Sequence, residues 1–218
     1  MLVFADANLV MFAVPKTGTT ALHLALRSKA DIVFSGKAAL KHMTVRKYDR
    51  HFAPYLKEAH GLEPERAAVI RHPVEQLKSW YRYRLRPSAR GKQSALVGMS
   101  FDDFVAAVIA DRSPEFAKVG SQLTFVSSGN GALRVEHLFA YERPVVFRQF
   151  LEARLGREVV TKPKNVSPPA DAVLSPDMEA QLRAARAGEF ALYERIIAAG
   201  GHLHSALEDD VAKVGKTG

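Results

Sequence analysis

Apolar and polar positions along the chain predict strands that are each followed by a helix. Leu9 to Val14 and Ala67 to Ile70 are short apolar runs that lead into proline or charged residues, so each predicts a buried strand. Helical apolar spacing follows both runs, over Thr19 to about Ser28 and over Pro73 to about Leu85. This alternation predicts an α/β fold in which helices cover both faces of a central parallel sheet.

The same patterning predicts the remaining elements. Further strands are expected over residues 31–34 and 133–141, and helices over residues 44–60, 100–110 and 144–155. A last long helix should begin at Ser175-Pro176, with the serine as its cap. We expect residues 1–208 to form a single domain and residues 209–218 to form a flexible C-terminal tail.

A polar turn, Pro15-Lys16-Thr17-Gly18-Thr19-Thr20, joins the first strand to the first helix. A helix N-terminus carries unsatisfied N–H groups and a partial positive charge, and the lysine and threonines add a charge and hydroxyl donors. The turn therefore predicts an anion site. It differs from the nucleoside triphosphate motif GxxxxGK[ST], because Lys16 precedes its only glycine. A nucleotide kinase or NTPase is nevertheless one alternative, and an ordinary strand–helix junction is another.

A second cationic group follows the next predicted strand. Arg71 stands at the strand end, where its forked guanidinium can bind a phosphate. Helical spacing places Gln76, Ser79, Arg82 and Arg86 on one face of the next helix. Because the C-terminal ends of parallel strands share one edge, Lys16 and Arg71 are expected in one crevice. A solvated basic helix face is the simpler interpretation of this segment taken alone.

Composition narrows the classes of partner and chemistry. The 218 residues carry a net charge of +8, which favours an anionic partner. The absence of cysteine excludes disulfides, thiolate metal sites and thiol catalysis. The first residues lack the basic segment of a signal peptide, and their apolar run is too short to span a bilayer, so we expect a cytoplasmic protein without a membrane span. A non-catalytic nucleotide- or nucleic-acid-binding protein is a further alternative, although no specific nucleic-acid contact is expected.

Two motifs together resemble the sulfotransferase family, whose donor is 3′-phosphoadenosine 5′-phosphosulfate (PAPS). PKTGTT is followed about fifty residues later by R-x-P-x5-S-x-Y-R, and weaker similarity continues in Leu138–Glu142, in the Asn165–Pro168 segment and in Phe190–Tyr193. The resemblance covers about residues 8 to 200 and implies a three-layer P-loop-like fold. The chain departs from many relatives at Gln76, where they have arginine. It also lacks the membrane anchor of Golgi members, so it looks like a soluble bacterial-type member of the carbohydrate branch.

The resemblance also implies roles for individual residues. Pro15, Lys16, Thr17, Gly18, Thr19 and Thr20 would cradle the 5′-phosphosulfate, while Arg71 and Ser79 would bind the 3′-phosphate. Lys16 would stabilise the leaving phosphate, and the product would be adenosine 3′,5′-bisphosphate. No metal is expected. The acceptor is expected to be a hydroxyl, with a carbohydrate as one candidate.

An acceptor hydroxyl needs a general base, and the candidates are His42, His72, Glu75 and Glu142. His42 is preferred, because it lies in a basic segment after the second predicted strand, where the family keeps acceptor-side residues. Lys162 and Lys164, in a proline-rich loop, either close over the cofactor or belong to a solvated loop. Trp80, the only tryptophan, is expected to pack in the core.

Overall fold

Six strands form one sheet in this computed structural model, which describes residues 1–86, 96–161 and 172–207. The strand order across the sheet is β3-β1-β2-β4-β5-β6. The strands are β1 (Leu2–Phe4), β2 (Leu9–Met11), β3 (Ile32–Val33), β4 (Glu65–Ile70), β5 (His137–Ala140) and β6 (His202–His204). β2, β4 and β5 pair in parallel at the centre, whereas the pairs β1–β2, β1–β3 and β5–β6 are antiparallel.

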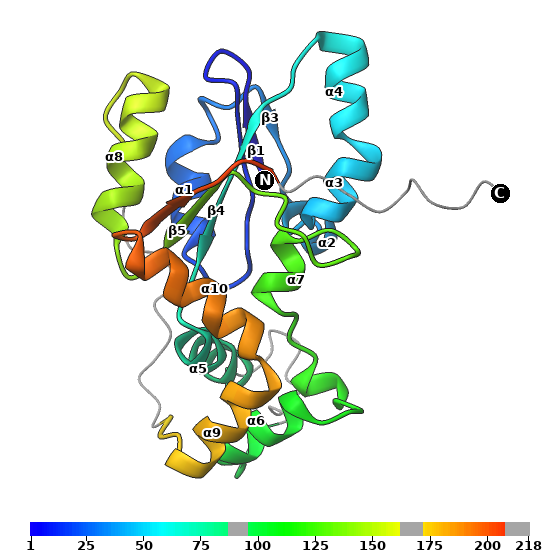
Figure 1. The fold of residues 1–218 in the computed structure, drawn as a ribbon, viewed down its shortest axis with the longest axis vertical. Helices are drawn as coiled ribbons and strands as arrows, with labels where there is room; N and C mark the ends of the chain where they lie inside the picture. Colours follow the sequence, from blue (N-terminus) through cyan, green and yellow to red (C-terminus); the bar gives the residue numbers. More distant parts are fainter. Residues whose placement is uncertain (87–95, 162–171, 208–218) are drawn as a thin grey trace, which may run out of the picture.

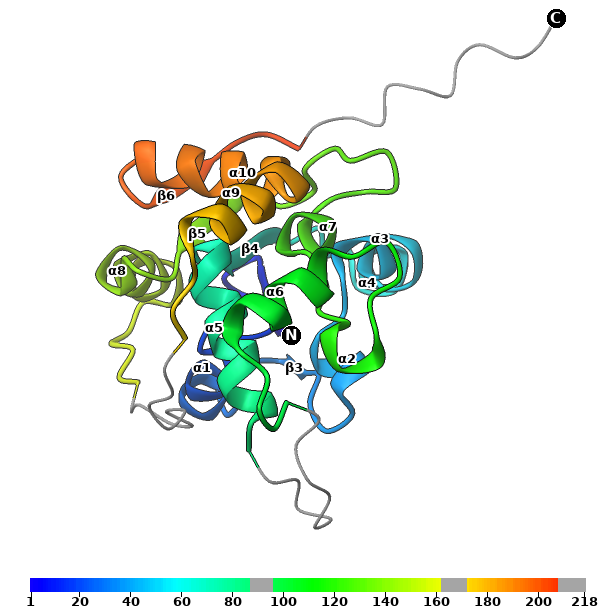
Figure 2. The ribbon, with the colours of Figure 1, turned by 90° about the horizontal axis from the view of Figure 1, so that it is seen from below.

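Helices lie on both faces of this sheet, so the predicted α/β fold is confirmed (Figure 1). The helices are α1 (Thr19–Leu26), α2 (Ala38–Lys41), α3 (Val45–His51), α4 (Ala53–His60), α5 (Pro73–Arg84), α6 (Phe101–Ile109), α7 (Gln122–Val126), α8 (Pro144–Leu155), α9 (Pro176–Ala185) and α10 (Ala187–Ala198), with a 3-10 turn η1 (Glu115–Ala117). Figures 1 and 2 place α1 and α8 on one face and α3, α4 and α7 on the other. The sheet is parallel only at its centre, where the predicted strand–helix units lie.

The central strands are buried on both faces, which explains why they appear in the sequence as continuous apolar runs. On β4, Ala67 and Val69 pack toward α1 and α8, whereas Ala68 and Ile70 pack toward α3, α7 and α10. On β5, Phe139 belongs to the first of these cores and its two neighbours to the second. Alternate side chains thus anchor one helical layer to each face.

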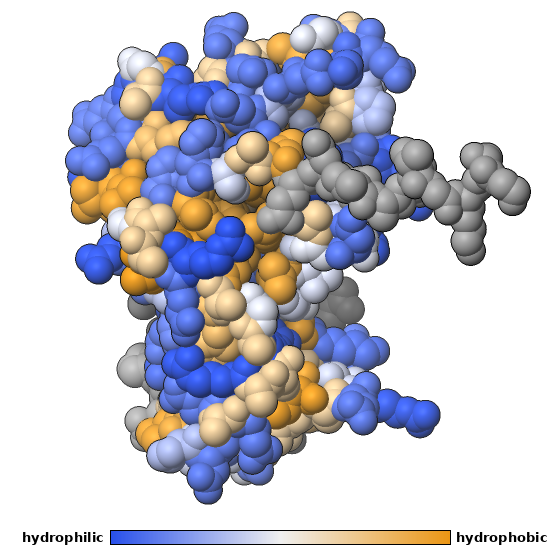
Figure 3. Space-filling view, in the orientation of Figure 1, coloured by the Kyte–Doolittle hydropathy of each residue, from blue (hydrophilic) through white to orange (hydrophobic). Residues whose placement is uncertain are grey.

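A third apolar cluster lies beyond the C-terminal ends of the parallel strands. It joins α5, α6 and α9 through buried side chains such as Leu77, Phe104 and Leu182. Figure 2 shows α5, α6 and α9 in front of the sheet when the molecule is seen from that end. In Figure 3 the coloured surface narrows between the body around the sheet and this group of helices. The predicted binding edge of the sheet therefore faces a helical lobe.

Several predicted elements are confirmed closely. α8 begins at Pro144 and ends at Gly156, which takes the left-handed conformation that glycine favours (φ 63°). The helix expected over residues 100–110 is present as α6, which begins with a capping box of Ser100 and Asp103. The Ser175 hydroxyl accepts a hydrogen bond from the Met178 N–H, as predicted for α9.

Two predicted helices are each broken into two. The helix expected over residues 44–60 divides at Phe52 into α3 and α4, because Pro54 lacks the N–H that a continuous helix would use. The last long helix divides at Arg186 (φ −123°, ψ 32°) into α9 and α10.

Two strands, β1 and β6, were not predicted, whereas the strand expected over residues 31–34 is present as β3 at one edge of the sheet. β1 forms a hairpin with β2 through a turn in which Asn8 has a positive φ of 46°, a conformation that asparagine tolerates. β6 adds a short antiparallel strand beside β5. Three predicted segments, the tail after residue 208, Lys162 with Lys164, and Asn165–Pro168, lie outside the described residues.

Candidate functional site

The C-terminal ends of β2, β4 and β5 converge on the turn from Pro15 to Thr20. Phe12 to Val14 continue β2 as buried backbone up to this turn. The Thr17 hydroxyl donates to the Val14 carbonyl at 2.9 Å, so the buried threonine closes the turn on itself. Gly18 precedes the first residue of α1 with a φ of 71°. The predicted strand, turn and helix N-terminus are therefore present.

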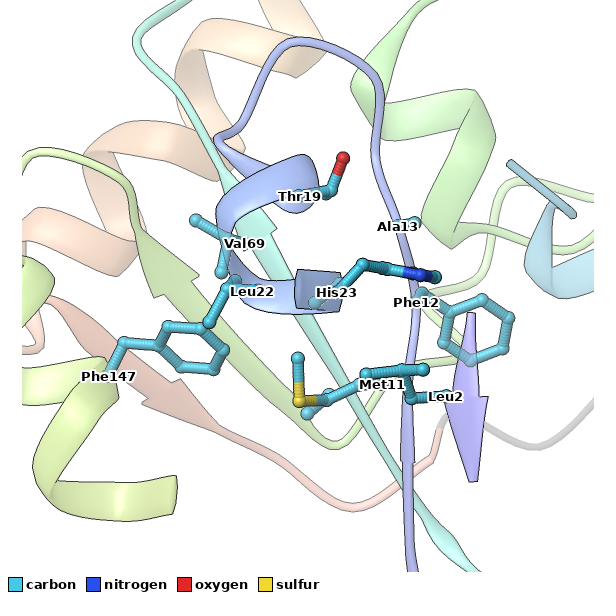
Figure 4. Close-up of a pocket in the computed structure, with 11 residues that line it drawn as sticks. Leu2, Met11, Phe12, Ala13, Thr19, Leu22, His23, Val69 and Phe147 are labelled. Atoms are coloured by element: carbon cyan, nitrogen blue, oxygen red, sulfur yellow. The ribbon is translucent and has the colours of Figure 1, made fainter. Parts of the chain in front are cut away.

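Helix α1 is held on the sheet directly beneath this turn. Figure 4 shows Leu22 of α1 beside Val69 of β4 and Phe147 of α8, whereas His23 of α1 points the other way, toward Phe12 and Ala13. The cavity among these side chains measures about 10 Å³, about enough for one water molecule. The close packing of these side chains holds α1 on the sheet, and the cavity among them offers no space for a ligand.

Arg71 and the Lys16 turn lie together, as predicted for one crevice. Arg71 Nη1 donates to the Lys16 carbonyl at 3.4 Å. Gln76, which is buried at 1% exposure, donates from Nε2 to the Pro15 carbonyl at 3.3 Å. Both carbonyls of the turn's first two residues are thus held by side chains of the second motif. Gln76 therefore helps to fix the backbone of the turn.

The Arg71 guanidinium lies over the ring of Tyr141, with 4.6 Å from Cζ to the ring centroid. The same ring lies against Gly18, where an added Cβ would stand 3.1 Å from Tyr141 Cε2. Arg71 Nη2 is also 3.9 Å from Glu75 Oε2, and the other oxygen of this carboxylate, Oε1, pairs with Lys78 at 2.8 Å. Arg71 Nε is buried and has no hydrogen-bond partner among the described residues. One donor of the fork is therefore available to a ligand.

Gln122 fixes the backbone of Arg71 from the opposite side. Its buried amide accepts from the Arg71 N–H at 2.9 Å and donates to the Arg71 carbonyl at 2.8 Å. A further N–H of this amide donates to the buried carboxylate of Glu189 at 3.1 Å. Sequence analysis missed Gln122, because a single glutamine in a short segment carries no spacing signal and α7 itself was not predicted.

The Lys16 side chain lies on aromatic rings of α5. Its ammonium is 4.0 Å from the ring centroid of Tyr83 and 5.3 Å from that of Trp80. Burial, and then the charges of three nearby arginines, lower the pKa of Lys16 to about 8. The Lys16 backbone has a φ of 69°, which is unusual for a residue with a side chain. Sequence analysis assigned Trp80 only to the core and did not single out Tyr83.

His42 follows α2 and lies beside the end of β2. Its Nδ1 is 2.6 Å from the Ala13 carbonyl, which can only accept, so Nδ1 carries the proton. In the neutral ring Nε2 then holds the lone pair that a general base needs. Burial lowers the pKa of His42, so the neutral form dominates at pH 7. Next to it, Lys41 donates to the Thr20 hydroxyl at 3.2 Å, which links this segment to the turn.

The other candidate bases are engaged in structural contacts. Glu142 accepts from the His72 N–H at 3.1 Å and from the Tyr193 hydroxyl at 3.0 Å. Burial lowers the pKa of His72, and its ring packs edge-on against Tyr193. Burial favours the neutral form of Glu75, but the hydrogen bond and charge of Lys78, together with the charges of Arg71 and Arg82, outweigh it and lower the pKa of this carboxyl.

Ser79 lies partly buried on α5, one turn after Gln76. Among the described residues, no hydrogen bond joins it to Arg71 or to the turn. Its helix position agrees with the predicted face of α5, and its proposed contact with a phosphate stays a prediction. Val74, Leu77 and Tyr81 are buried, in agreement with the helical apolar spacing predicted for this segment.

A cavity of about 560 Å³ opens beside the turn, between α1 and α8. Its wall includes Thr17 and Gly18 of the turn, Tyr141 and Glu142 after β5, and Arg148 of α8. This volume is in the range of small-molecule and nucleotide sites. Thr17 and Gly18 bring the polar turn into its wall, and apolar side chains such as Val145 and Leu151 line much of the rest.

Within residues 1–86, 96–161 and 172–207, no group of three or more histidine, aspartate or glutamate side chains is arranged to hold a metal ion. No helix in these same ranges is long and apolar enough to cross a membrane.

No family model matches this chain, and no curated protein matches it. Among solved structures, the chain is similar to the crystal structure of a sulfotransferase from Alicyclobacillus acidocaldarius, at 18% sequence identity and a TM-score of 0.46. The match covers 88% of this chain and 95% of that chain.

Proposed function

We propose that this protein is a sulfotransferase that moves a sulfuryl group from PAPS to an acceptor hydroxyl. The observation that carries the proposal is the contact between its two anion-binding motifs. Arg71 Nη1 donates to the Lys16 carbonyl, although 55 positions separate the two residues. A donor with phosphates at both its 5′ and 3′ positions needs two such cationic groups at short range.

Unpartnered donors support an anion at this place. Arg71 Nε and Trp80 Nε1 are both buried without a hydrogen-bond partner among the described residues. Buried donors left in this state cost free energy, about 1–3 kcal/mol each, unless a ligand accepts from them. A phosphate oxygen would satisfy Arg71 Nε, and the N-terminus of α1 adds the N–H donors of Thr19 and Thr20.

The cavity of about 560 Å³ supports a nucleoside on the same ligand. It starts at Gly18, so a group bound at the turn can extend directly into it. Tyr141, which is 37% exposed and lines this cavity, offers a flat face for a base or ribose. The rest of the cavity wall is largely apolar and includes Val145, which favours a flat purine over a second charged group.

In the proposed reaction, the acceptor oxygen attacks sulfur in line with the bond from sulfur to the 5′-phosphate oxygen. A new S–O bond forms as the old one breaks, and the leaving oxygen stays on adenosine 3′,5′-bisphosphate. Lys16 and the turn's N–H groups stabilise the charge on that oxygen. His42 Nε2 takes the acceptor proton, while the Ala13 carbonyl holds the ring in the required tautomer. Arg71 and Ser79 hold the 3′-phosphate.

A ligand comparison tests this proposal. Adenosine 3′,5′-bisphosphate should raise the melting temperature, because a ligand at ~100 times its dissociation constant stabilises the folded state by ~2.7 kcal/mol. ADP and ATP, which lack the 3′-phosphate, should give a much smaller shift. Arg71→Ala should remove most of the preference for the bisphosphate. A larger shift with ATP than with the bisphosphate would contradict the proposal and favour a kinase or NTPase.

A further inference from the structure

The Lys16 ammonium, assigned above to the leaving phosphate, contacts two aromatic rings instead of a polar partner. Nζ lies 4.0 Å from the Tyr83 centroid and 5.3 Å from the Trp80 centroid. Among the described residues, no hydrogen bond or ion pair reaches this ammonium. A lysine that only closed a structural turn would be expected to point into water or toward a carboxylate.

Both rings come from α5, the helix that also carries Gln76. Positions 80 and 83 are three apart, so their side chains share one face of the helix. Gln76 lies one turn earlier and holds the Pro15 carbonyl. One turn of α5 therefore holds the peptide group between Pro15 and Lys16, while the Lys16 ammonium lies on the rings of the next turn.

We propose that Trp80 and Tyr83 form a clamp that holds Lys16 in a resting position, and that an anion bound at the turn draws the ammonium out of it. The identity of that anion as the donor's 5′-phosphosulfate rests on the proposed function. Trp80 and Tyr83 are positioning residues in this account, because they act through Lys16.

The two positions of Lys16 differ in the kind of interaction they offer. A ring face attracts an ammonium through its quadrupole, without a hydrogen bond. A phosphate oxygen gives a charge-assisted hydrogen bond, which is stronger. The four-carbon side chain of lysine can rotate between the two. The Lys16 ammonium therefore stays on the two rings when the turn is empty, and it moves to the anion when one binds.

The two rings of the clamp also reduce the electrostatic repulsion among the cations around the empty turn. Besides burial, the charges of Arg86, Arg71 and Arg84 lower the pKa of Lys16. Arg84 also lies over the Trp80 ring, with 5.4 Å from Cζ to the ring centroid. Packing cations close together is unfavourable, and the electron-rich ring faces partly offset this repulsion. Once the anion binds, it supplies that compensation itself.

The intrinsic fluorescence of the protein can report this movement, because Trp80 is the only tryptophan of the chain. Removing an ammonium from the ring changes the field at the indole and hence its emission. We expect saturating adenosine 3′,5′-bisphosphate, and separately inorganic pyrophosphate, to change the Trp80 emission of the wild-type protein excited at long wavelength. In Lys16→Met, which has no ammonium to move, the change should be lost. Calorimetry on the same samples reports binding independently.

The outcomes separate the clamp from the proposed function. Bisphosphate that binds without changing Trp80 emission, or that changes it equally in Lys16→Met, would overturn the clamp and leave the function standing. Pyrophosphate that changes the emission while the bisphosphate does not bind would support the clamp and contradict the function. If neither anion binds, both proposals fall.

A second variant tests the clamp through affinity. Tyr83→Leu removes the nearer ring, which competes with the ligand for the ammonium, so the bisphosphate should bind roughly 2- to 5-fold more tightly. Tyr55→Leu is a matched control, because both tyrosines are 51% exposed and Tyr55 lies on α4, away from the turn. Its affinity should equal that of the wild type. Weaker binding by Tyr83→Leu would overturn the clamp, since Tyr83 would then contact the ligand itself.

Discussion

Gln122 hydrogen-bonds both the N–H and the carbonyl of Arg71. The two distances are 2.9 Å from the Arg71 N–H to Gln122 Oε1 and 2.8 Å from Gln122 Nε2 to the Arg71 carbonyl. Arg71 is the first residue after β4, where the ladder with β5 ends, so its backbone would otherwise lack a partner on this side. One buried side chain thereby fixes the direction in which the guanidinium leaves the sheet.

Gln122→Met should weaken both stability and ligand binding. Methionine keeps the volume but leaves both polar groups of the Arg71 peptide and the Glu189 carboxylate without the amide. We expect a loss of about 1–3 kcal/mol in the free energy of unfolding, measured by urea denaturation. We also expect weaker binding of adenosine 3′,5′-bisphosphate by calorimetry. Thr124→Ala, on an exposed position of the same helix, should change stability by less than about 0.5 kcal/mol.

If Gln122→Met lost stability but bound the bisphosphate normally, the orientation of Arg71 would not depend on Gln122. If neither property changed, the two hydrogen bonds would contribute nothing measurable.

Gly18→Ala should disturb the site beyond its effect on the backbone. Gly18 has a φ of 71°, and a Cβ there would stand 3.1 Å from Tyr141 Cε2. Gly36→Ala is a matched control, because Gly36 has a φ of 77° and open space around it. Both variants should lose about 1–2 kcal/mol of stability from the left-handed backbone. Only Gly18→Ala should also displace Tyr141 and weaken bisphosphate binding. Equal binding by the two variants would contradict a role for this contact.

The sequence predicted the anion turn because local chemistry determines it. The order of strand, Lys16, Gly18 and helix depends on neighbouring residues, and the structure has the same order. The helix that follows Arg71 was predicted for the same reason, since Pro73 and the apolar spacing after it act locally.

The partners that hold the site were not predicted, because they come from distant segments. Gln122 reaches Arg71 across 51 positions, and Tyr141 reaches Gly18 only after β4 and β5 have paired. Neither contact leaves a periodic pattern in the sequence. The hairpin of β1 and β2 was missed for a different reason. Its turn ends in Asn8 rather than in the Asn-Gly or Asp-Gly pair that marks the commonest two-residue turns.

Ligand affinity should depend on the protonation of Lys16. Burial and nearby arginines lower its pKa to about 8, so the free protein loses this charge as the pH rises through 8. An anion binds the charged form better. We therefore expect bisphosphate affinity to be constant below about pH 7 and to fall above pH 8, by up to about tenfold per pH unit, in calorimetric titrations. In Lys16→Arg, which stays protonated throughout this range, the fall should be absent.

If Lys16→Arg showed the same loss of affinity above pH 8, another group would be responsible. A wild-type affinity that stayed constant up to pH 10 would contradict the lowered pKa.

The backbone conformation at Lys16 should lower the free energy of unfolding. Its φ of 69° is disfavoured for any residue with a Cβ and is readily adopted by glycine. Lys16→Gly and Lys16→Ala remove the same ammonium, so their difference isolates the backbone. We expect Lys16→Gly to be more stable than Lys16→Ala by about 1–2 kcal/mol in urea denaturation. Equal stabilities would mean that the turn relaxes to another conformation when the lysine is removed.

The role proposed for His42 can be separated from its structural contact. The amide of asparagine can replace Nδ1–H as the donor to the Ala13 carbonyl, but it has no basic atom in the place of Nε2. His42→Asn should therefore bind the bisphosphate as the wild type does, while sulfuryl transfer from PAPS to an acceptor alcohol falls by about 10²- to 10⁴-fold. His42→Ala should lose transfer equally and also some stability, because the Ala13 carbonyl loses its donor. Full transfer by His42→Asn would show that another group takes the acceptor proton, and Glu75 and Glu142 would be the next residues to replace.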